Sequence, residues 1–268
     1  MLGLEEKYAY AVGRTRTVEA RLLDRATVER MIDASDVHGA FKVLEEAGYA
    51  HVDSSAKDLL PIDEILEQEE SKLLRFIKET SPDERLSKLV TLRHDYHNLK
   101  VMLKAEIYNV SPGIAMSRLG TLSAEAISKA MDGEMRELPV EFGSAIEKAK
   151  AIHSLRPSPE VIDIVIDRVM HETLLDLAQT IGIPFLIEHV QREIDFLNLS
   201  IFLRARKMKR DKWLVDHAFV AGGNVDHVKL VHAYEDESAD ALMDVLSGTG
   251  YEFIARRGLK LVEEGASL

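Results

Sequence analysis

The sequence of 268 residues is 46% hydrophobic and 30% charged, a composition typical of folded globular proteins and unlike that of disordered chains. It contains no cysteine, which excludes disulfides, thiolate metal ligands and a cysteine nucleophile. The formal net charge of -12 argues against nucleic acid as a ligand, because binding to phosphates requires clustered Lys and Arg.

The N-terminal segment carries Glu5 and Glu6 where an export signal would have a basic region followed by an apolar run. No stretch of the sequence reaches the roughly 18 apolar residues that a membrane span requires. We therefore expect neither an export signal nor a transmembrane segment.

Apolar residues recur at steps of three and four along almost the whole chain, and strand-like alternation is scarce. This pattern predicts an all-α fold. Apolar stripes indicate two long helices, one from Leu86 to Ile107 and the other from Ile187 to Ile201. Each stripe is expected to pack against other helices.

Capping motifs indicate where two helices begin. The segment 81–84, Ser-Pro-Asp-Glu, predicts a capping hydroxyl, a proline in the first turn and a reciprocal glutamate. Ser158 and Pro159 predict a second start of the same kind. The helix that follows is expected to stop at Gly182 and Pro184.

An eleven-residue segment, 95–105, recurs as 195–205 at an offset of 100 residues without a gap. Five positions are identical and four others change like for like, which favours duplication of a helical unit over chance. The signature of the repeat is Asp95, Asn98 and Leu99 in the first copy and Asp195, Asn198 and Leu199 in the second.

Weaker sequence similarities indicate a third copy. The segment 43–49, with Val-Leu followed by Gly-Tyr, has a similar segment at 245–251, and residues 122–123 match 23–24 more weakly. These similarities predict three helical units, at 1–108, 109–218 and 219–268. The third unit would be incomplete, because no third Asp-x-x-Asn-Leu helix is reached.

The Asp and Asn of each signature lie three residues apart, which places them on one face of the helix. One interpretation is a ligand site. The other, which we favour, is that each pair satisfies backbone groups at the end of a neighbouring short helix. A buried polar group without a partner would destabilise the fold by about 1–3 kcal/mol.

His94, Asp95 and His97 form the densest cluster of candidate metal ligands. The two histidines are three residues apart, whereas zinc-binding pairs on helices are usually four apart, and the second copy has Ile194 and Leu197 instead. We therefore predict no metal and no cofactor. A metal-dependent hydrolase built on these three residues stays open as an alternative.

Gly222 and Gly223 follow an apolar pair, yet the sequence has no Gly-x-Gly-x-x-Gly and no phosphate loop ending in Gly-Lys-Ser/Thr. These glycines are expected to bend the chain between the second and third units. No Gly-x-Ser-x-Gly elbow is present either. The motifs thus predict a protein that is not an enzyme.

One basic cluster stands out in this acidic chain. Its members are Arg204, Arg206, Lys207, Lys209, Arg210 and Lys212. They lie where a long helix is expected to end, so they could complement the helix dipole. The other interpretation is contact with acidic loops or lipid headgroups.

Four motifs occur together in this chain: Tyr-Ala-Tyr with Gly-Arg at 8–14, Glu-Ala-Arg-Leu-Leu at 19–23, Leu-Arg-His-Asp-Tyr-His-Asn-Leu at 92–99, and Glu-Ile-Asp with Asn-Leu at 193–199. In these motifs the sequence resembles the C subunits of the archaeal and bacterial A/V-type rotary ATPases, which are relatives of the d subunit of eukaryotic vacuolar ATPases.

The resemblance implies three units around a pseudo-threefold axis, arranged as a funnel. It implies a non-catalytic rotor subunit, peripheral on the inner, cytoplasmic face of the membrane. Its partners would be the D and F subunits of the central stalk and the membrane proteolipid ring. Arg204, Arg206, Lys207, Lys209 and Arg210 are then the hypothetical partner-binding edge. A generic helical scaffold of another complex is the alternative.

Overall fold

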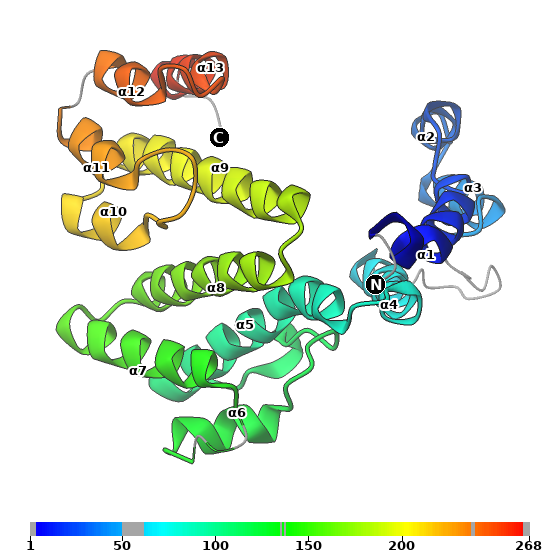
Figure 1. The fold of residues 1–268 in the computed structure, drawn as a ribbon, viewed down its shortest axis with the longest axis horizontal. Coiled ribbons are helices and arrows are strands. Elements are labelled where there is room, and N and C mark those ends of the chain that lie inside the picture. The colour runs from blue at the N-terminus through cyan, green and yellow to red at the C-terminus, as the bar shows by residue number, and fades with distance from the viewer. Residues whose placement is uncertain (1–3, 50–61, 135, 137, 237–238, 265–268) are drawn as a thin grey trace. The chain divides into compact units, whose positions relative to one another are not determined.

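The computed structural model describes residues 4–49, 62–134, 136, 138–236 and 239–264. Within these ranges all regular secondary structure is helical, which confirms the predicted all-α fold (Figure 1). The chain divides into two compact units, Met1–Thr91 and Leu92–Leu268, hereafter unit 1 and unit 2. No helix in the described part of the chain is long and apolar enough to span a bilayer.

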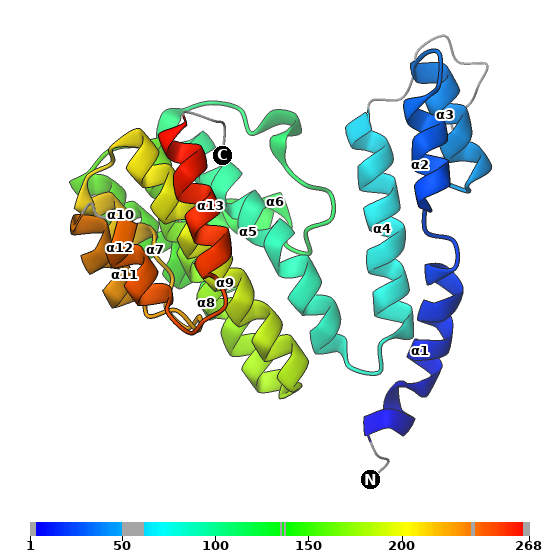
Figure 2. The same cartoon turned by 90° about the horizontal axis from the view of Figure 1, so that it is seen from above.

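Unit 1 contains helices α1 (Leu4–Glu19), α2 (Arg25–Ile32), α3 (Val37–Glu46) and α4 (Ile62–Thr80). Helix α2 pairs with α3, and α1 lies beside α4 (Figure 2). Asp24 caps α2 by accepting a hydrogen bond from the backbone of Thr27, and Asp36 caps α3 in the same way. The described apolar side chains that are buried in this unit are few, namely Phe41, Val43 and Ile65.

Long helices form the first part of unit 2. They are α5 (Glu84–Tyr108), in which the division between the units falls, α7 (Val140–Leu155), α8 (Pro159–Ile181) and α9 (Pro184–Met208), with the shorter η1 (Gly113–Ala115) and α6 (Ala124–Met131) between them. Helix α8 packs between α7 and α9. Tyr96 of α5 is fully buried, stacks on Phe142 of α7 at 4.5 Å between ring centroids, and shares a 2.9 Å hydrogen bond with Thr173 of α8.

Four shorter helices complete unit 2: α10 (Lys212–Ala218), α11 (His227–Glu235), α12 (Ala239–Leu246) and α13 (Glu252–Glu263). Helices α10, α11 and α13 pack on α9. Phe202 of α9 is fully buried in an apolar cluster with Phe219, Leu230 and Leu246. Burial of such side chains stabilises the fold by about 1.5–3 kcal/mol each, so this cluster holds the short helices on α9.

The structure corrects one predicted helix start and confirms the other. Helix α5 begins at Glu84, and its capping side chain is Asp83, whose carboxylate accepts from the backbone N–H of Arg85 at 3.1 Å. Ser81 instead bonds the backbone of Asp83, so it lies too far before the helix to cap it. At the start of α8, Ser158 is the N-cap as predicted.

Helices α5 and α9 end in the same way, 100 residues apart. Asn109 and Lys209 follow them in the left-handed conformation, with φ of 50° and 51°. The next residue in each case donates its backbone N–H at 2.9 Å to the carbonyl of an alanine, Ala105 or Ala205. Both alanines belong to the repeated segment, so the repeat includes the device that terminates the helix.

Candidate functional site

The Asp–Asn pair of α5 binds the loop that leads to α6. Asp95 accepts hydrogen bonds from the backbone N–H groups of Thr121 at 2.5 Å and Leu122 at 2.9 Å, and from the Thr121 hydroxyl at 2.7 Å. Asn98 exchanges two hydrogen bonds with the backbone of Ser117, donating at 2.9 Å and accepting at 2.7 Å. The pair therefore fixes the loop just before Ser123, the N-cap of α6.

The pair of α9 does the same for the loop that leads to α11. Asn198 exchanges hydrogen bonds of 2.8 and 2.9 Å with the backbone of Val220. Asp195, fully buried, accepts from the Val225 N–H and the Asn224 side chain, both at 2.9 Å, and from the Tyr251 hydroxyl at 3.1 Å. The helix capped by Asp226 begins immediately afterwards.

Two glycines make room for these Asp–Asn contacts with the loops, hereafter called the braces. A Cβ on Gly120 would lie 2.6 Å from the amide nitrogen of Asn98, and a Cβ on Gly223 would overlap the Asp195 carboxylate. These glycines are 103 residues apart, three more than the helix repeat, because the second loop contains the longer α10. The sequence predicted only a bend at Gly223. The role of Gly120 was not predicted, because at the repeat offset of 100 the two glycines do not align with each other.

Gly222 has a different requirement. Its φ of +99° lies in the left-handed region, and a Cβ there would overlap the Leu175 side chain of α8. The loop after α10 therefore turns at this position and passes closely over α8.

His94 and His97 do not converge on a common point with Asp95. His94 Nδ1 lies 3.1 Å from the Ser117 hydroxyl, and His97 Nε2 lies 2.8 Å from the Ala115 carbonyl oxygen. In the described parts of the chain, no three His, Asp or Glu side chains are grouped in a way that could hold a metal ion. The three residues considered for metal binding instead contact η1 and the loop between η1 and α6.

Equivalent positions of the two long helices contact each other directly. Arg93 of α5 donates to both carboxylate oxygens of Glu193 of α9 at 2.5 Å, and the two residues are separated by the repeat offset of 100. Since both side chains are partly exposed, we expect this ion pair to add about 1 kcal/mol or less to stability. Its interest is geometric, because it joins equivalent positions of α5 and α9.

The basic cluster lies at the end of α9, and its members separate into two groups. Arg206 donates to the Ala233 carbonyl at 3.0 Å, Arg210 binds both oxygens of Glu160, and Lys212 pairs with Glu235 at 2.6 Å. The other members, Arg204, Lys207 and Lys209, are exposed. Half of the basic cluster is thus also used to join α9 and α10 to neighbouring helices.

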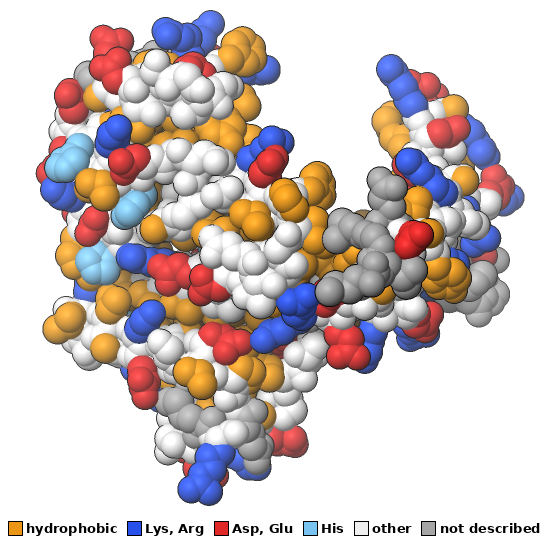
Figure 3. All heavy atoms as spheres, viewed as in Figure 1, with side chains coloured by type: hydrophobic (Ala, Val, Ile, Leu, Met, Phe, Trp, Pro, Cys, Tyr) orange, Lys and Arg blue, Asp and Glu red, His pale blue; other side chains and the backbone are white. Residues whose placement is uncertain are grey.

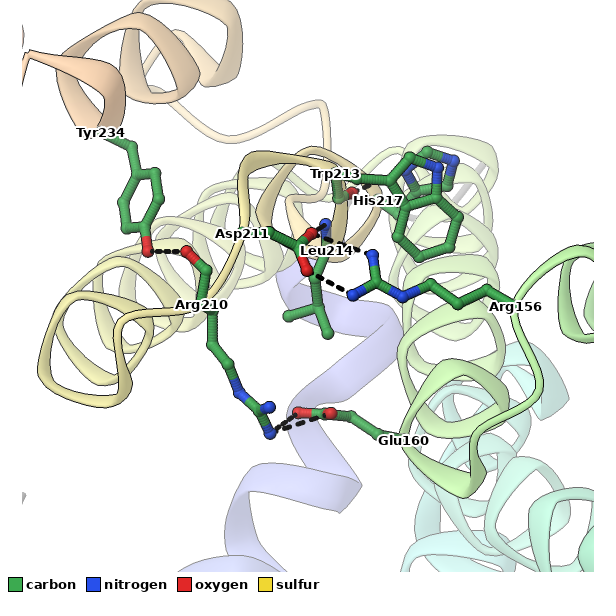
Figure 4. A network of polar contacts seen from close by, with 8 residues as sticks. All are labelled: Arg156, Glu160, Arg210, Asp211, Trp213, Leu214, His217 and Tyr234. Carbon is green, nitrogen blue, oxygen red and sulfur yellow. Dashed lines mark hydrogen bonds and ion pairs between the residues drawn. The ribbon is translucent and has the colours of Figure 1, made fainter.

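A polar network surrounds the junction between α9 and α10 (Figure 4). Asp211 caps α10 by accepting from the Leu214 N–H at 3.0 Å and forms a two-pronged ion pair with Arg156. The Arg156 guanidinium and the Leu214 N–H lower the pKa of Asp211 to about 2. Arg156 also lies over the Trp213 ring, 4.8 Å from its centroid, so the turn after α7 is tied to the start of α10.

On the face drawn in Figure 3, acidic and basic side chains are interspersed over unit 2, with hydrophobic side chains between them. A single-signed face of the kind that binds nucleic acid is not visible in this view. The distinctive feature of the unit is instead its internal bracing.

The fold and these contacts define a class of protein: an all-helical protein whose paired Asp and Asn side chains hold loops against long helices. The chain belongs to the ATP synthase (C/AC39) subunit family, whose sequence model matches residues 11–266. The resemblance carried by the motifs is thereby confirmed.

Two relatives illustrate the match. The chain is 26% identical over 227 residues to the C subunit of the V-type sodium ATPase of Enterococcus hirae, covering 82% of this chain and 67% of that protein. It is 21% identical over 280 aligned residues to the C subunit of the A-type ATP synthase of Methanocaldococcus jannaschii, covering 97% of this chain and 70% of that protein. The chain therefore matches about two thirds of the length of both relatives.

Proposed function

We propose that this protein is a non-catalytic coupling subunit of a rotary A/V-type ATPase. It would connect the central stalk, formed by the D and F subunits, to the membrane proteolipid ring during ATP-coupled transport of protons or sodium. It would act as a peripheral protein on the inner, cytoplasmic face of the membrane. The family match over residues 11–266 carries the proposal.

The mechanical requirements of such a subunit agree with the bracing. A part that transmits torque must resist bending, and close-packed helices are stiff. The loops that join them are fixed by buried Asp195 and Asn198, and by Asp95 and Asn98 in the first copy. Loops held in this way move with the helices instead of absorbing strain.

The contact between Arg93 and Glu193 supports a rotational arrangement of the predicted units 1–108, 109–218 and 219–268. When units are related by rotation about an axis, equivalent residues meet only close to that axis. The two side chains would therefore mark a position near the pseudo-threefold axis of the proposed funnel.

The proposed partner-binding edge comprises Arg204, Arg206, Lys207, Lys209 and Arg210, and its exposed members are best suited to test it. Arg206 and Arg210 also make contacts within the chain, so changing them would disturb the fold as well as a partner. Arg204 and Lys207 are exposed on the last turns of α9. Opposite charges on a partner would be attracted there, chiefly affecting the rate of association.

The test is co-elution with the purified D and F pair of the same organism, followed by calorimetry. The double variant Arg204→Glu/Lys207→Glu should bind the pair at least about tenfold more weakly, because two attractive charges become repulsive. The matched control reverses two exposed cations elsewhere, Lys148→Glu/Arg192→Glu. Failure of the unaltered chain to bind the pair would favour a helical scaffold of another complex, and equal effects of both double variants would reject the basic edge.

A further inference from the structure

A cavity of about 420 Å³ lies at the end of α9 and is lined by Arg206, Lys209, Arg210 and Tyr234. The described lining residues carry three positive charges, one of which, that of Arg210, is paired with Glu160, in a chain whose formal net charge is -12. Glu160 compensates Arg210, whereas the Coulomb repulsion between Arg206 and Lys209 would be reduced by a further anion. The cavity is therefore an electropositive concavity in an acidic protein.

Two of the three cations of the cavity are held in place. Arg206 is fixed by its hydrogen bond to Ala233 and by the ring of Phe202, whose centroid lies 4.7 Å from the guanidinium carbon. Arg210 is held at both ends, since its side chain binds Glu160 and its carbonyl accepts from the Tyr234 hydroxyl at 2.6 Å. Preorganised donors lose little conformational entropy when a ligand binds.

One donor in the cavity lining has no acceptor. The Nε–H group of Arg210 is buried and makes no hydrogen bond to the described residues. A buried donor left unpaired destabilises a protein by about 1–3 kcal/mol. This atom has no surface open to solvent, so an anion between the two guanidinium groups would supply the acceptor only once the Arg210 side chain turns its Nε–H toward the cavity.

We propose that this cavity binds a phosphate-type oxyanion, either as free phosphate or as a phosphomonoester. A phosphate group offers at least three acceptor oxygens and nearly two negative charges at neutral pH. It therefore matches two guanidinium forks and an ammonium better than one carboxylate does, because a carboxylate offers two oxygens and one charge. Binding of this kind would not depend on the rotary-ATPase function, since it concerns the isolated chain.

The experiment is calorimetric titration of the whole chain with inorganic phosphate and with glycerol 3-phosphate, at constant ionic strength. Trp213, the single tryptophan, lies three residues after Arg210 and gives a second signal through its fluorescence. Vesicles of phosphatidylcholine with and without phosphatidic acid form a further arm, which tells a lipid headgroup from a soluble phosphate.

The informative variant is Lys209→Asn. It removes one charge from the cavity while placing asparagine in the left-handed conformation that Asn109 adopts at the end of α5, so the helix end should be preserved. Loss of one charge-assisted hydrogen bond should raise the Kd for phosphate about tenfold or more. The matched control, Arg192→Ala, removes an equal charge from the same helix 17 residues before Lys209, about 25 Å away and well beyond the Debye length of roughly 8–10 Å.

Saturable phosphate binding that Lys209→Asn weakens and Arg192→Ala leaves within about twofold would support the site. Saturable binding confined to phosphatidic acid vesicles, with the same response to the variants, would support it with a lipid headgroup as the source. Absence of saturable binding in all arms, or equal losses in both variants, would overturn it. Binding of polyglutamate without binding of any phosphate compound would overturn it as well.

Discussion

Asn198 is fully buried, and both of its hydrogen bonds go to one residue, Val220. An amide side chain can donate and accept at once. It therefore supplies the hydrogen bonds that the N–H and carbonyl of Val220 would otherwise make within a helix or a sheet. Neither a carboxylate nor an aliphatic side chain could do both. This requirement explains why the same residue type recurs at Asn98, where the partner is Ser117.

Replacing Asn198 with alanine should therefore destabilise the protein by about 2–4 kcal/mol, because the buried backbone N–H and the buried carbonyl of Val220 would both lose their hydrogen-bond partner. Urea unfolding followed by circular dichroism measures the change. Ser200→Ala, an exposed substitution on the same helix, serves as the control and should stay within about 0.5 kcal/mol of the unaltered protein. A loss below about 1 kcal/mol for Asn198→Ala would mean that water can take the place of the amide.

His171 is a buried titratable group of α8, and burial lowers its pKa from the usual 6.5, only partly opposed by its hydrogen bond to the Asp167 carbonyl. The folded state thus holds the neutral ring, while the unfolded chain takes up a proton near pH 6.5. Stability should be full above that pH and should fall as the pH drops below it, because the unfolded state then binds more protons.

The variant His171→Asn should flatten this dependence, since asparagine can donate to the same carbonyl without titrating. The measurement is the free energy of unfolding between about pH 7.5 and 5, compared for the two proteins. Parallel curves for both would assign the loss of stability in acid to other groups.

At the scale of elements, the loops between the long and short helices depend on close approach of the backbone to a brace. Gly120 and Gly223 leave the space that the Asp and Asn side chains occupy. The Asp195 carboxylate cannot move away from a new methyl group without giving up its bonds to Val225 and Asn224. The brace and the glycine are therefore one structural unit, although they are far apart in sequence.

Gly223→Ala is expected to destabilise the protein by about 2–4 kcal/mol, through overpacking and through the loss of hydrogen bonds to Asp195. Gly120→Ala should have the same sign with a smaller effect, because the contact it creates is longer. Thermal unfolding of both variants measures which one is destabilised more.

Gly13→Ala is the control. A Cβ there meets no atom within 4 Å, and alanine in the middle of α1 should stabilise the protein by up to about 1 kcal/mol. Equal stability of Gly223→Ala and the unaltered protein would show that the loop can shift freely.

For the whole molecule, the distribution of buried residues predicts two levels of stability. Among the described residues, unit 1 buries only Phe41, Val43 and Ile65 of its large apolar side chains, whereas the long helices of unit 2 carry most of the core. Local unfolding follows the amount of apolar surface that is buried. Unit 1 should therefore open more readily than unit 2.

Two probes can separate these events in one urea titration. Circular dichroism should detect an early loss of helix from unit 1, whereas the fluorescence of Trp213, which lies in unit 2, should change only at higher urea. Hydrogen exchange should likewise be faster in α2 and α3 than in α8. Coincident transitions by both probes would mean that the chain unfolds as one cooperative unit.

The sequence by itself determined the helical class, the long helices, the family and the repeated Asp–Asn signature, because these depend on periodicity and on residues close together in the chain. Ser158 and Gly182 were likewise recognisable as helix ends, since capping involves neighbouring residues. Only the tertiary structure decided what the signature binds, because its partners lie 19 to 56 residues further along the chain. It also decided which cations of the basic cluster contact other helices and which line the cavity, since adjacent positions on a helix point in different directions.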